Sequence, residues 1–228
     1  MPRHTEEGNV RGAVTTLSNN TTGPLSLSKR YWGLDWNEHL PWSFEDIRVE
    51  SASFDAAFPF IQEHYPRIFG MHAGDARFLA NPMTEAKRRF CAESDTFLFR
   101  TDAQEVGVFM ANPIDWSSYY MRTVGVLPEF RDRKVFARFL EQLYGPLRKA
   151  GVERVETECS PGNAPVMRTL VAQGFMVTST ATSERWGATV RFTKLLTAEA
   201  ESVFLRQFNG VTARNKFALT PTLERSTL

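Results

Sequence analysis

The pattern of apolar and polar positions predicts alternating strands and helices over most of the chain. Apolar residues at three- and four-residue steps indicate amphipathic helices over residues 54–65, 83–92, 163–173 and from about 133 onward. Short apolar runs indicate strands near residues 47–49, 96–100, 105–111, 119–126, 154–159, 176–181 and 188–195. The order is strand, two helices, three strands, helix, strand, helix and two strands, which predicts a mixed α/β domain with one main sheet.

Local signals set the expected ends of the helices. Asn81-Pro82 supplies a cap and a first-turn proline for the second predicted helix, and Thr197 is suited to cap a short terminal helix. Gly145-Pro146 should bend or stop the helix that starts near residue 133, because a proline inside a helix removes a backbone hydrogen bond. We therefore expect that helix to end early.

The two ends of the chain differ from its middle. Residues 1–28 are rich in Thr, Ser, Asn and Gly without apolar periodicity, and they predict a flexible tail in which nothing is buried. Residues 29–45 show no helix or strand period and are interpreted as an aromatic strap buried on the surface, with substrate stacking as the alternative. The large aromatic residues of this strap are Tyr31, Trp32, Trp36 and Trp42. Residues 46–196 form the predicted main domain, and residues 197–228 a helix and polar tail.

Composition narrows the possible partners and location. Hydrophobic residues make up 42% and charged residues 23%, as in folded proteins, and the formal net charge is +1. That charge argues against nucleic acid or an anionic membrane as a partner. No run of about 18 apolar residues occurs. The two cysteines, Cys91 and Cys159, are too few for a disulfide scaffold or a thiolate zinc site. We therefore expect a cytoplasmic protein without a metal.

Three motifs resemble those of the GNAT superfamily of N-acyltransferases. Residues 124–136 read VGVLPEFRDRKVF and resemble the acyl-donor motif of that family. Asn163 and Gly174 are eleven residues apart, as in its second motif, and Gly107 lies in a run that resembles the strand before these motifs. The resemblance covers about residues 46–196. It implies a GNAT-like fold, with a central, mostly antiparallel sheet, splayed middle strands and helices on both faces.

The first motif also has a physical reason to bind phosphate. A strand that turns into a helix presents unpaired N–H groups at the positive end of the helix dipole, which favours a pyrophosphate. A solvated basic turn is the alternative interpretation. The resemblance implies that acetyl-CoA or another acyl-CoA is the co-substrate. The residues implied to bind it are Val124, Val126, Arg131, Asp132, Arg133, Lys134, Val135, Phe136 and Asn163.

Within that set, the resemblance gives Val124 and Val126 backbone bonds to the pantetheine arm, with Asn163 on its far side. Asn163 also fits a plain helix cap. Lys134 and Phe136 stand where the family often has glycine. Because of these departures, an acyl carrier protein remains an alternative donor.

Candidate catalytic groups lie near the second motif. Glu158 precedes Asn163 by five residues and resembles the strand glutamate that serves as base in ribosomal-protein N-terminal acetyltransferases of this superfamily. Glu156 shares its strand face by the two-residue period; the alternative is that both glutamates simply face solvent. Leu170 stands where the family has a proton-donating tyrosine, so water, Tyr119 or Tyr120 would protonate the leaving thiolate. The catalytic candidates are Glu158, Glu156 and Tyr120.

These residues predict an enzyme that moves an acetyl or longer acyl group from acyl-CoA to a primary amine of a small molecule, peptide or protein. The acceptor surface is expected over residues 67–77 and 183–187, with possible contributions from His64, His72 and Trp186. A non-catalytic acyl-CoA-binding or sensor module is the competing prediction. A homodimer is left open.

Overall fold

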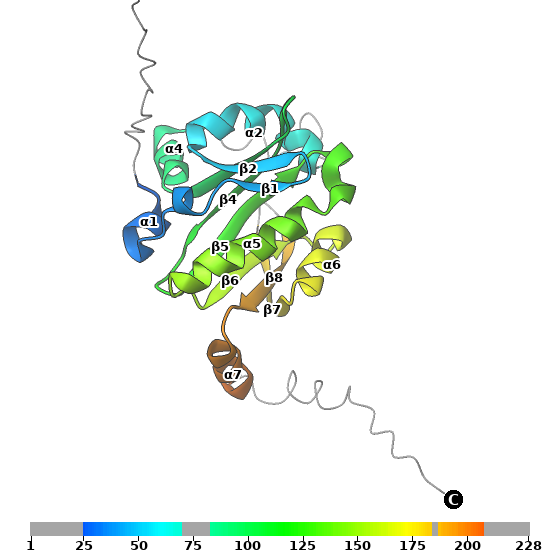
Figure 1. Ribbon diagram of the computed structural model, residues 1–228. Helices are drawn as coiled ribbons and strands as arrows, with labels where there is room; N and C mark the ends of the chain where they lie inside the picture. The colour runs from blue at the N-terminus through cyan, green and yellow to red at the C-terminus, as the bar shows by residue number, and fades with distance from the viewer. Residues whose placement is uncertain (1–24, 70–82, 184–186, 208–228) are drawn as a thin grey trace, which may run out of the picture.

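The computed structural model describes residues 25–69, 83–183 and 187–207. Within them, eight strands form one mixed sheet in the order β1-β2-β3-β4-β5-β6-β8-β7 (Figure 1). The β5–β6 pair is parallel and the other pairs are antiparallel, as expected for a mostly antiparallel sheet. The strands are β1 (Trp42–Phe44), β2 (Ile47–Ala52), β3 (Asp95–Arg100), β4 (Glu105–Pro113), β5 (Ser118–Val126), β6 (Arg154–Cys159), β7 (Met176–Ser183) and β8 (Gly187–Leu195).

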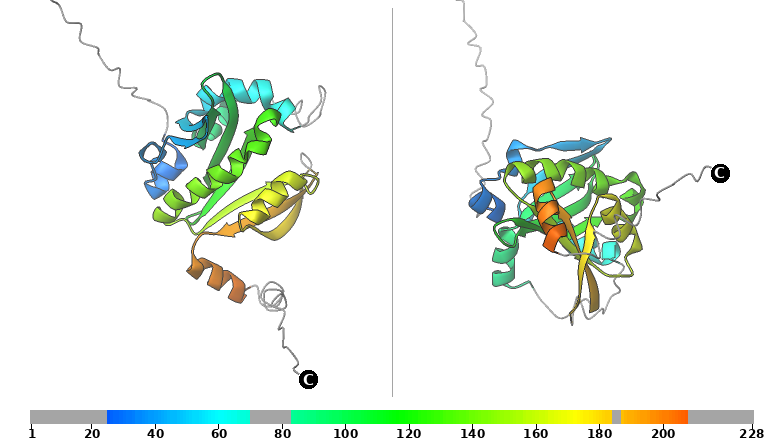
Figure 2. Two further views of the ribbon diagram at one scale, coloured as in Figure 1. Left: turned by 45° about the vertical axis from the view of Figure 1, so that its right-hand side comes forward. Right: turned by 90° about the horizontal axis from the view of Figure 1, so that it is seen from below.

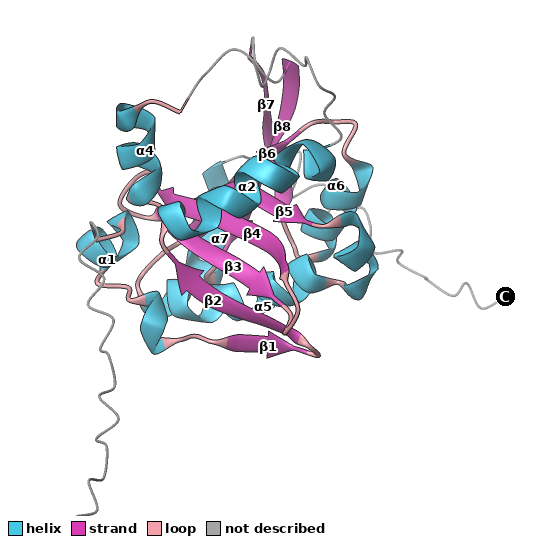
Figure 3. Ribbon diagram, turned by 90° about the horizontal axis from the view of Figure 1, so that it is seen from above, coloured by secondary structure: helices cyan, strands magenta, loops and turns pink. Residues whose placement is uncertain are grey.

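Helices cover both faces of this sheet (Figure 3). The α-helices are α1 (Leu27–Trp32), α2 (Phe54–Phe69), α4 (Glu85–Ala92), α5 (Val135–Lys149), α6 (Ala164–Ala172) and α7 (Ala198–Gln207). The short 3-10 helices are η1 (Trp36–Glu38) and η2 (Pro128–Arg133). From β2 to β8 the order of elements is the one predicted from the sequence, and the mixed α/β fold is confirmed.

Two apolar layers hold the helices on the sheet. On one face, α5 buries Phe139, Leu140 and Leu143 against inward-facing strand residues, including Phe97 and Phe109. On the other face, α2 packs on a second cluster that contains Phe54, Ala57, Phe60, Leu98, Val108 and Met110. Since successive side chains of a strand point to opposite faces, this two-sided burial follows from the apolar runs of β3 and β4.

Gly107 in β4 has a packing role. A Cβ at this position would lie 2.6 Å from Cδ2 of Phe99 and 2.7 Å from the carbonyl oxygen of Gly125. Only a residue without a Cβ atom leaves room at this position for the Phe99 ring of β3 and the Gly125 carbonyl of β5.

The amino-terminal segment is more regular than the sequence predicts. Residues 29–45 contain most of α1, all of η1 and the edge strand β1. Trp36 is buried, and its ring lies 5.1 Å from that of Phe97, whereas Tyr31 is 68% exposed. The strap is therefore built partly from secondary structure. Trp42–Phe44 form a strand because they pair with β2, and the local pattern of apolar residues does not indicate this strand.

The predicted boundary at residue 28 is wrong. Ser28 is fully buried, and its hydroxyl donates a hydrogen bond to Oδ2 of Asp95. The Tyr119 hydroxyl donates to the same oxygen at 3.0 Å. Ser28 therefore belongs to the folded core, because a buried carboxylate needs hydrogen-bond donors. Residues 1–24 lie outside the described residues.

Two predicted helix boundaries also need correction. Helix α5 continues through Gly145 and Pro146 to Lys149, because Leu143, Tyr144 and Leu147 are buried around the proline. Helix α4 begins at Glu85, where the Thr84 side chain accepts a hydrogen bond from the Lys87 N–H group. Asn81-Pro82, the predicted cap of that helix, lies outside the described residues. None of the helices in the described ranges has the length and apolar character needed to cross a bilayer.

Candidate functional site

Strands β5 and β6 part midway along their length. Their ladder ends at the pair Met121 and Thr157, although both strands continue beyond it. The next residue of β5, Arg122, is the extra residue of a β-bulge, since β4 pairs with the residues on either side of it. A bulge bends its strand and interrupts pairing. The two halves of the sheet diverge from this point (Figure 2, left).

The backbone groups of β5 that face this opening come from Val124 and Val126. The Leu127 N–H group donates to the Val106 carbonyl of β4 at 2.9 Å. Because backbone groups alternate in direction along a strand, Val124 and Val126 direct theirs away from β4, toward the side that β6 leaves open. The opening therefore presents the N–H groups of both residues and the Val124 carbonyl, whereas the Val126 carbonyl accepts a hydrogen bond from Arg131.

The turn after β5 ends in a left-handed residue. Lys134 has φ 55° and ψ 25° and forms the start of α5. No side chain caps this end of α5, and its first turn contains no acidic residue. The first N–H groups of a helix have no acceptor within the helix. They are therefore available to an anion at this end of α5, where Lys134 itself is exposed and has no ion pair among the described residues.

The two arginines of this turn are engaged within the protein. Arg131 donates from Nε to the Val126 carbonyl at 3.3 Å and from Nη2 to the Ile68 carbonyl at 2.7 Å. Arg133 is bound to Glu45 and Asp46 of the β1–β2 turn. Hydrogen bonds from Arg133 lower the pKa values of both carboxyl groups below their usual range. Lys134 is therefore the cation of the turn that is best placed for an added anion.

The remaining predicted donor-site residues surround the same turn or the next helix. Asp132 is exposed, Val135 is buried, and Phe136 is partly buried against the core. Asn163 is the N-cap of α6, where its side chain accepts from the Val166 N–H group at 3.4 Å. The helix-cap interpretation of Asn163 is confirmed.

The three predicted catalytic side chains lie on the same face of the sheet. Tyr120 is the register partner of Glu156, and Glu158 is two residues further along β6. Arg191 of β8 joins the two carboxylates. Its Nε and Nη2 donate to Oε1 of Glu158 at 2.9 and 2.6 Å, and its Nη1 lies 3.5 Å from Oε2 of Glu156. The Thr189 hydroxyl donates to the other oxygen of Glu158 at 3.1 Å.

Tyr120 has the properties of a proton donor. Its burial, together with the negative charge of Glu158, raises its pKa above the usual value for tyrosine. It therefore remains protonated at neutral pH. Tyr119, the other tyrosine considered, is excluded because it points to the opposite face, is fully buried and donates to Asp95.

Leu170 and Cys159 are both explained by packing in the hydrophobic core. Leu170, at the position of the family tyrosine, is fully buried and brings no hydroxyl to the opening. Cys159 packs against the α5 side of the sheet, and burial raises the pKa of its thiol. A buried thiol is a poor nucleophile, in agreement with its interpretation as a small core residue.

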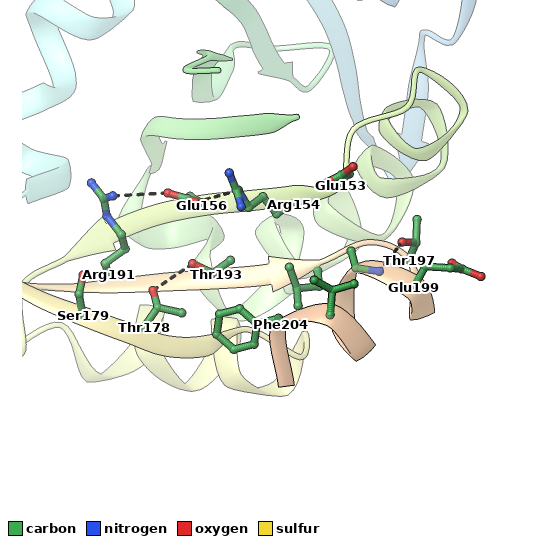
Figure 4. A pocket seen from close by; sticks show the side chains of 13 residues that line it. Glu153, Arg154, Glu156, Thr178, Ser179, Arg191, Thr193, Thr197, Glu199 and Phe204 are labelled. Atoms are coloured by element: carbon green, nitrogen blue, oxygen red, sulfur yellow. Dashed lines mark hydrogen bonds and ion pairs between the residues drawn. The ribbon is translucent and has the colours of Figure 1, made fainter. Parts of the chain in front are cut away.

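A pocket of about 590 Å³ adjoins this cluster, between the sheet and α7 (Figure 4). Glu156 and Arg191 line one part of it, and α7 contributes Ala200, Val203 and Phe204. Helix α7 starts after Thr197, whose hydroxyl accepts from the Ala200 N–H group at 3.1 Å, as predicted for this cap. The pocket and the carboxylate cluster are thus continuous.

Neither Arg191 nor this pocket is predicted from the sequence. The polar face of β8, with Thr189, Arg191 and Thr193 at two-residue steps, was a usable signal. Its significance depends on β8 lying beside β6, which the order of the chain does not reveal.

Of the predicted acceptor surface, His72 and Trp186 lie outside the described residues. His64 is on α2, with its ring 4.8 Å from that of Phe60.

The sequence model of the Acetyltransferase (GNAT) family matches residues 54–175, which is more than half of the 228 residues. This chain belongs to the GNAT acetyltransferase family. GNAT acetyltransferases are transferases, so the predicted enzyme class is confirmed at that level. A comparison with curated protein sequences gives no significant match.

Solved GNAT structures share the fold at low sequence identity. The putative acetyltransferase yncA of Salmonella typhimurium, solved with acetyl-CoA, is 15% identical over 68% of this chain and 96% of its own, with a TM-score of 0.53. Ard1 of Thermoplasma volcanium is 16% identical over 67% of this chain and 99% of its own, at 0.51. The ribosomal-protein-S18-alanine N-acetyltransferase of Escherichia coli is 13% identical over 66% of this chain and 94% of its own, at 0.50.

Proposed function

We propose that this GNAT protein transfers an acetyl or longer acyl group from acyl-CoA to a primary amine. The observation that carries the proposal is the parting of β5 and β6 after Met121 and Thr157. It exposes the backbone of Val124 and Val126 beside Tyr120 and Glu158. A binding groove and candidate proton-transfer groups therefore meet at one place in the sheet.

The residues at the opening fit a pantetheine diphosphate. The uncapped first turn of α5 and the exposed Lys134 suit the diphosphate, because N–H groups at a helix start bind anions. The backbone of Val124 and Val126 suits the amide groups of the pantetheine arm. The similar solved structure of yncA of Salmonella typhimurium contains acetyl-CoA, which supports the same class of donor here.

In this proposal the side chains of the protein position the reactants and transfer protons. The acyl-CoA supplies the acyl group as a thioester. Glu158 accepts a proton from the attacking amine, and Tyr120 donates one to the leaving thiolate. Glu158 accepts three hydrogen bonds from Arg191 and Thr189. Since a carboxylate offers about four lone-pair sites, one site remains for the amine.

A non-catalytic acyl-CoA sensor is the second candidate. It is favoured by the ion pair that holds Glu158 to Arg191, and by Leu170 in place of a tyrosine. In that case the opening binds the thioester, and the carboxylate cluster has a structural role. The two candidates predict the same binding and differ in amine-dependent release of CoA.

The test has three arms on the full chain. Calorimetry measures binding of acetyl-CoA, a thiol assay follows CoA release with a panel of primary amines, and an acyl carrier protein thioester replaces acyl-CoA in a parallel assay. Amine-dependent release with acetyl-CoA supports the enzyme. Binding without release for every amine supports the sensor. Turnover with the carrier-protein thioester alone changes the donor, and failure to bind either donor refutes both candidates.

A further inference from the structure

The pocket beside the carboxylate cluster has one apolar wall and one polar wall. Helix α7 provides most of the apolar wall, and the ring of Phe204 lies between the helix and the strands (Figure 4). The facing strands provide the hydroxyls of Thr178 and Thr193, which share a hydrogen bond of 3.0 Å. Such a pocket accepts a molecule that has an apolar part and a polar end.

The polar end of the pocket is part of the candidate catalytic cluster. Glu156 and Arg191 line the pocket, and the same Arg191 binds Glu158. Tyr120 lies opposite Glu156 in the β5–β6 ladder. A molecule in the pocket therefore has one end beside the groups assigned to proton transfer.

The charges around the pocket favour a cation. Three glutamates line it, Glu153, Glu156 and Glu199, against two arginines, Arg154 and Arg191. Both arginines already have ion pairs with glutamates of β6. The excess of negative charge favours a protonated amine over a carboxylate or phosphate.

The apolar wall comes from α7, which lies in the carboxyl-terminal part of the chain. The family model ends at residue 175, so α7 and β8 lie outside the matched segment. The donor opening, in contrast, lies inside it. The family match therefore does not account for the α7 wall of this pocket.

We propose that the pocket under α7 binds the acceptor, a small primary amine with an apolar substituent, and that Phe204 determines which amines fit. The inference rests on the proposed N-acyl transfer. The substituent lies against Phe204, and the amino group lies at the Glu156 end. There the bound ammonium first loses one proton to water. The free amine nitrogen then bonds to the acyl carbon, the carbon–sulfur bond breaks, Glu158 takes the second amine proton, Tyr120 protonates the thiolate, and the proton on Glu158 then restores the tyrosine. A volume of about 590 Å³ suits a whole small molecule.

The test changes the size of Phe204 and measures acceptor and donor separately. In Phe204→Trp, a larger ring fills the pocket, and we expect the KM for phenethylamine to rise by about 10- to 200-fold, the range for a misfitted apolar group. Phe204→Ala should shift kcat/KM toward bulkier amines. The Kd of acetyl-CoA, measured by calorimetry, should stay unchanged in both variants. Ser202→Trp, at an exposed position of α7, is the matched control.

The outcomes separate this inference from the proposed function. If wild type binds acetyl-CoA and acylates amines, but both Phe204 variants keep the same amine preference within about twofold, the pocket assignment is wrong. If acetyl-CoA does not bind, the proposed function fails, and ligand-observed NMR with phenethylamine still tests the pocket. Binding that Phe204→Trp weakens supports an amine site, and no binding refutes it. Acylation of peptides but not of free amines also refutes it.

Discussion

Arg191 donates two hydrogen bonds to one oxygen of Glu158, its register partner across the β6–β8 ladder. The same guanidinium lies 3.5 Å from Glu156. Without it, two carboxylates on one strand face would repel each other beside Tyr120. Arg191 therefore fixes the geometry of the cluster while leaving the second oxygen of Glu158 to the Thr189 hydroxyl and an incoming group.

Replacement of Glu158 tests the assignment of the general base. In Glu158→Gln, kcat should fall by about 100-fold or more, because a positioned base contributes at least that much. The Kd of acetyl-CoA should not change, since the contacts proposed for the donor come from the backbone of β5 and the start of α5 and not from Glu158. Steady-state kinetics and calorimetry measure the two effects. If Glu156→Gln loses activity and Glu158→Gln does not, the base is Glu156.

Tyr120→Phe tests the proton donor. Because burial and the Glu158 charge raise the pKa of Tyr120, its phenol remains protonated at alkaline pH, and wild-type kcat should not decline on its account until about pH 10 or above. The variant should show a lower kcat across the whole range. Tyr31→Phe, at an exposed tyrosine, is the control. A wild-type decline near pH 8 that disappears in Tyr120→Phe would contradict the assignment.

Charge reversal at the phosphate turn tests donor binding. Lys134→Glu should raise the Kd of acetyl-CoA by about 2- to 30-fold, because the lost attraction and the added repulsion between exposed charges are each worth about 0.2–1 kcal/mol. The difference should shrink in high salt. Lys149→Glu makes the same charge change at the other end of α5 and should leave the Kd unchanged. Equal effects of the two variants would remove the diphosphate from this turn.

The left-handed conformation of Lys134 gives a separate prediction about stability. Lys134→Gly should raise the free energy of unfolding by up to about 1 kcal/mol, since a side chain at positive φ costs about 1–2 kcal/mol and the added freedom of glycine offsets part of the gain. Lys134→Val should lower stability. Urea denaturation measures both. A destabilised glycine variant would show that the lysine side chain stabilises the turn.

The pH dependence of stability should reveal the buried Asp95. Burial raises its pKa, against the effect of hydrogen bonds from Ser28 and Tyr119. A raised folded-state pKa gives stability that is present below about pH 4, the unfolded value, and is lost as pH rises. In Asp95→Asn this loss is absent, so its stability relative to wild type should increase from pH 4 to pH 8. Denaturation at several pH values checks the sign, and a decreasing difference would contradict it.

The sequence predicts the elements well where local periodicity and burial agree, as in β3, β4 and α2. It fails where tertiary contacts override local signals. Burial of Leu143 and Leu147 carries α5 through Pro146, and pairing with β2 makes a strand of Trp42–Phe44. Both effects depend on residues far away in the chain.

The candidate site, too, is predicted from the sequence only where local patterns determine it. Placement of Glu156 and Glu158 on one face follows from the two-residue period of a strand. Arg191 joins them because β8 is inserted between β6 and β7. The hydrogen bond from Arg131 to the Val126 carbonyl likewise depends on how the turn after β5 folds, which the pattern of charges in the sequence does not specify.

The insertion of β8 between β6 and β7 also bears on how the chain matures during synthesis. Translation delivers β6 and β7 first, yet each has β8 as a neighbour in the finished sheet. Amino-terminal parts of a nascent chain organise first. The carboxyl half of this sheet has to wait for Gly187–Leu195 to leave the ribosome, so the salt bridges of Arg191 are among the last contacts to form.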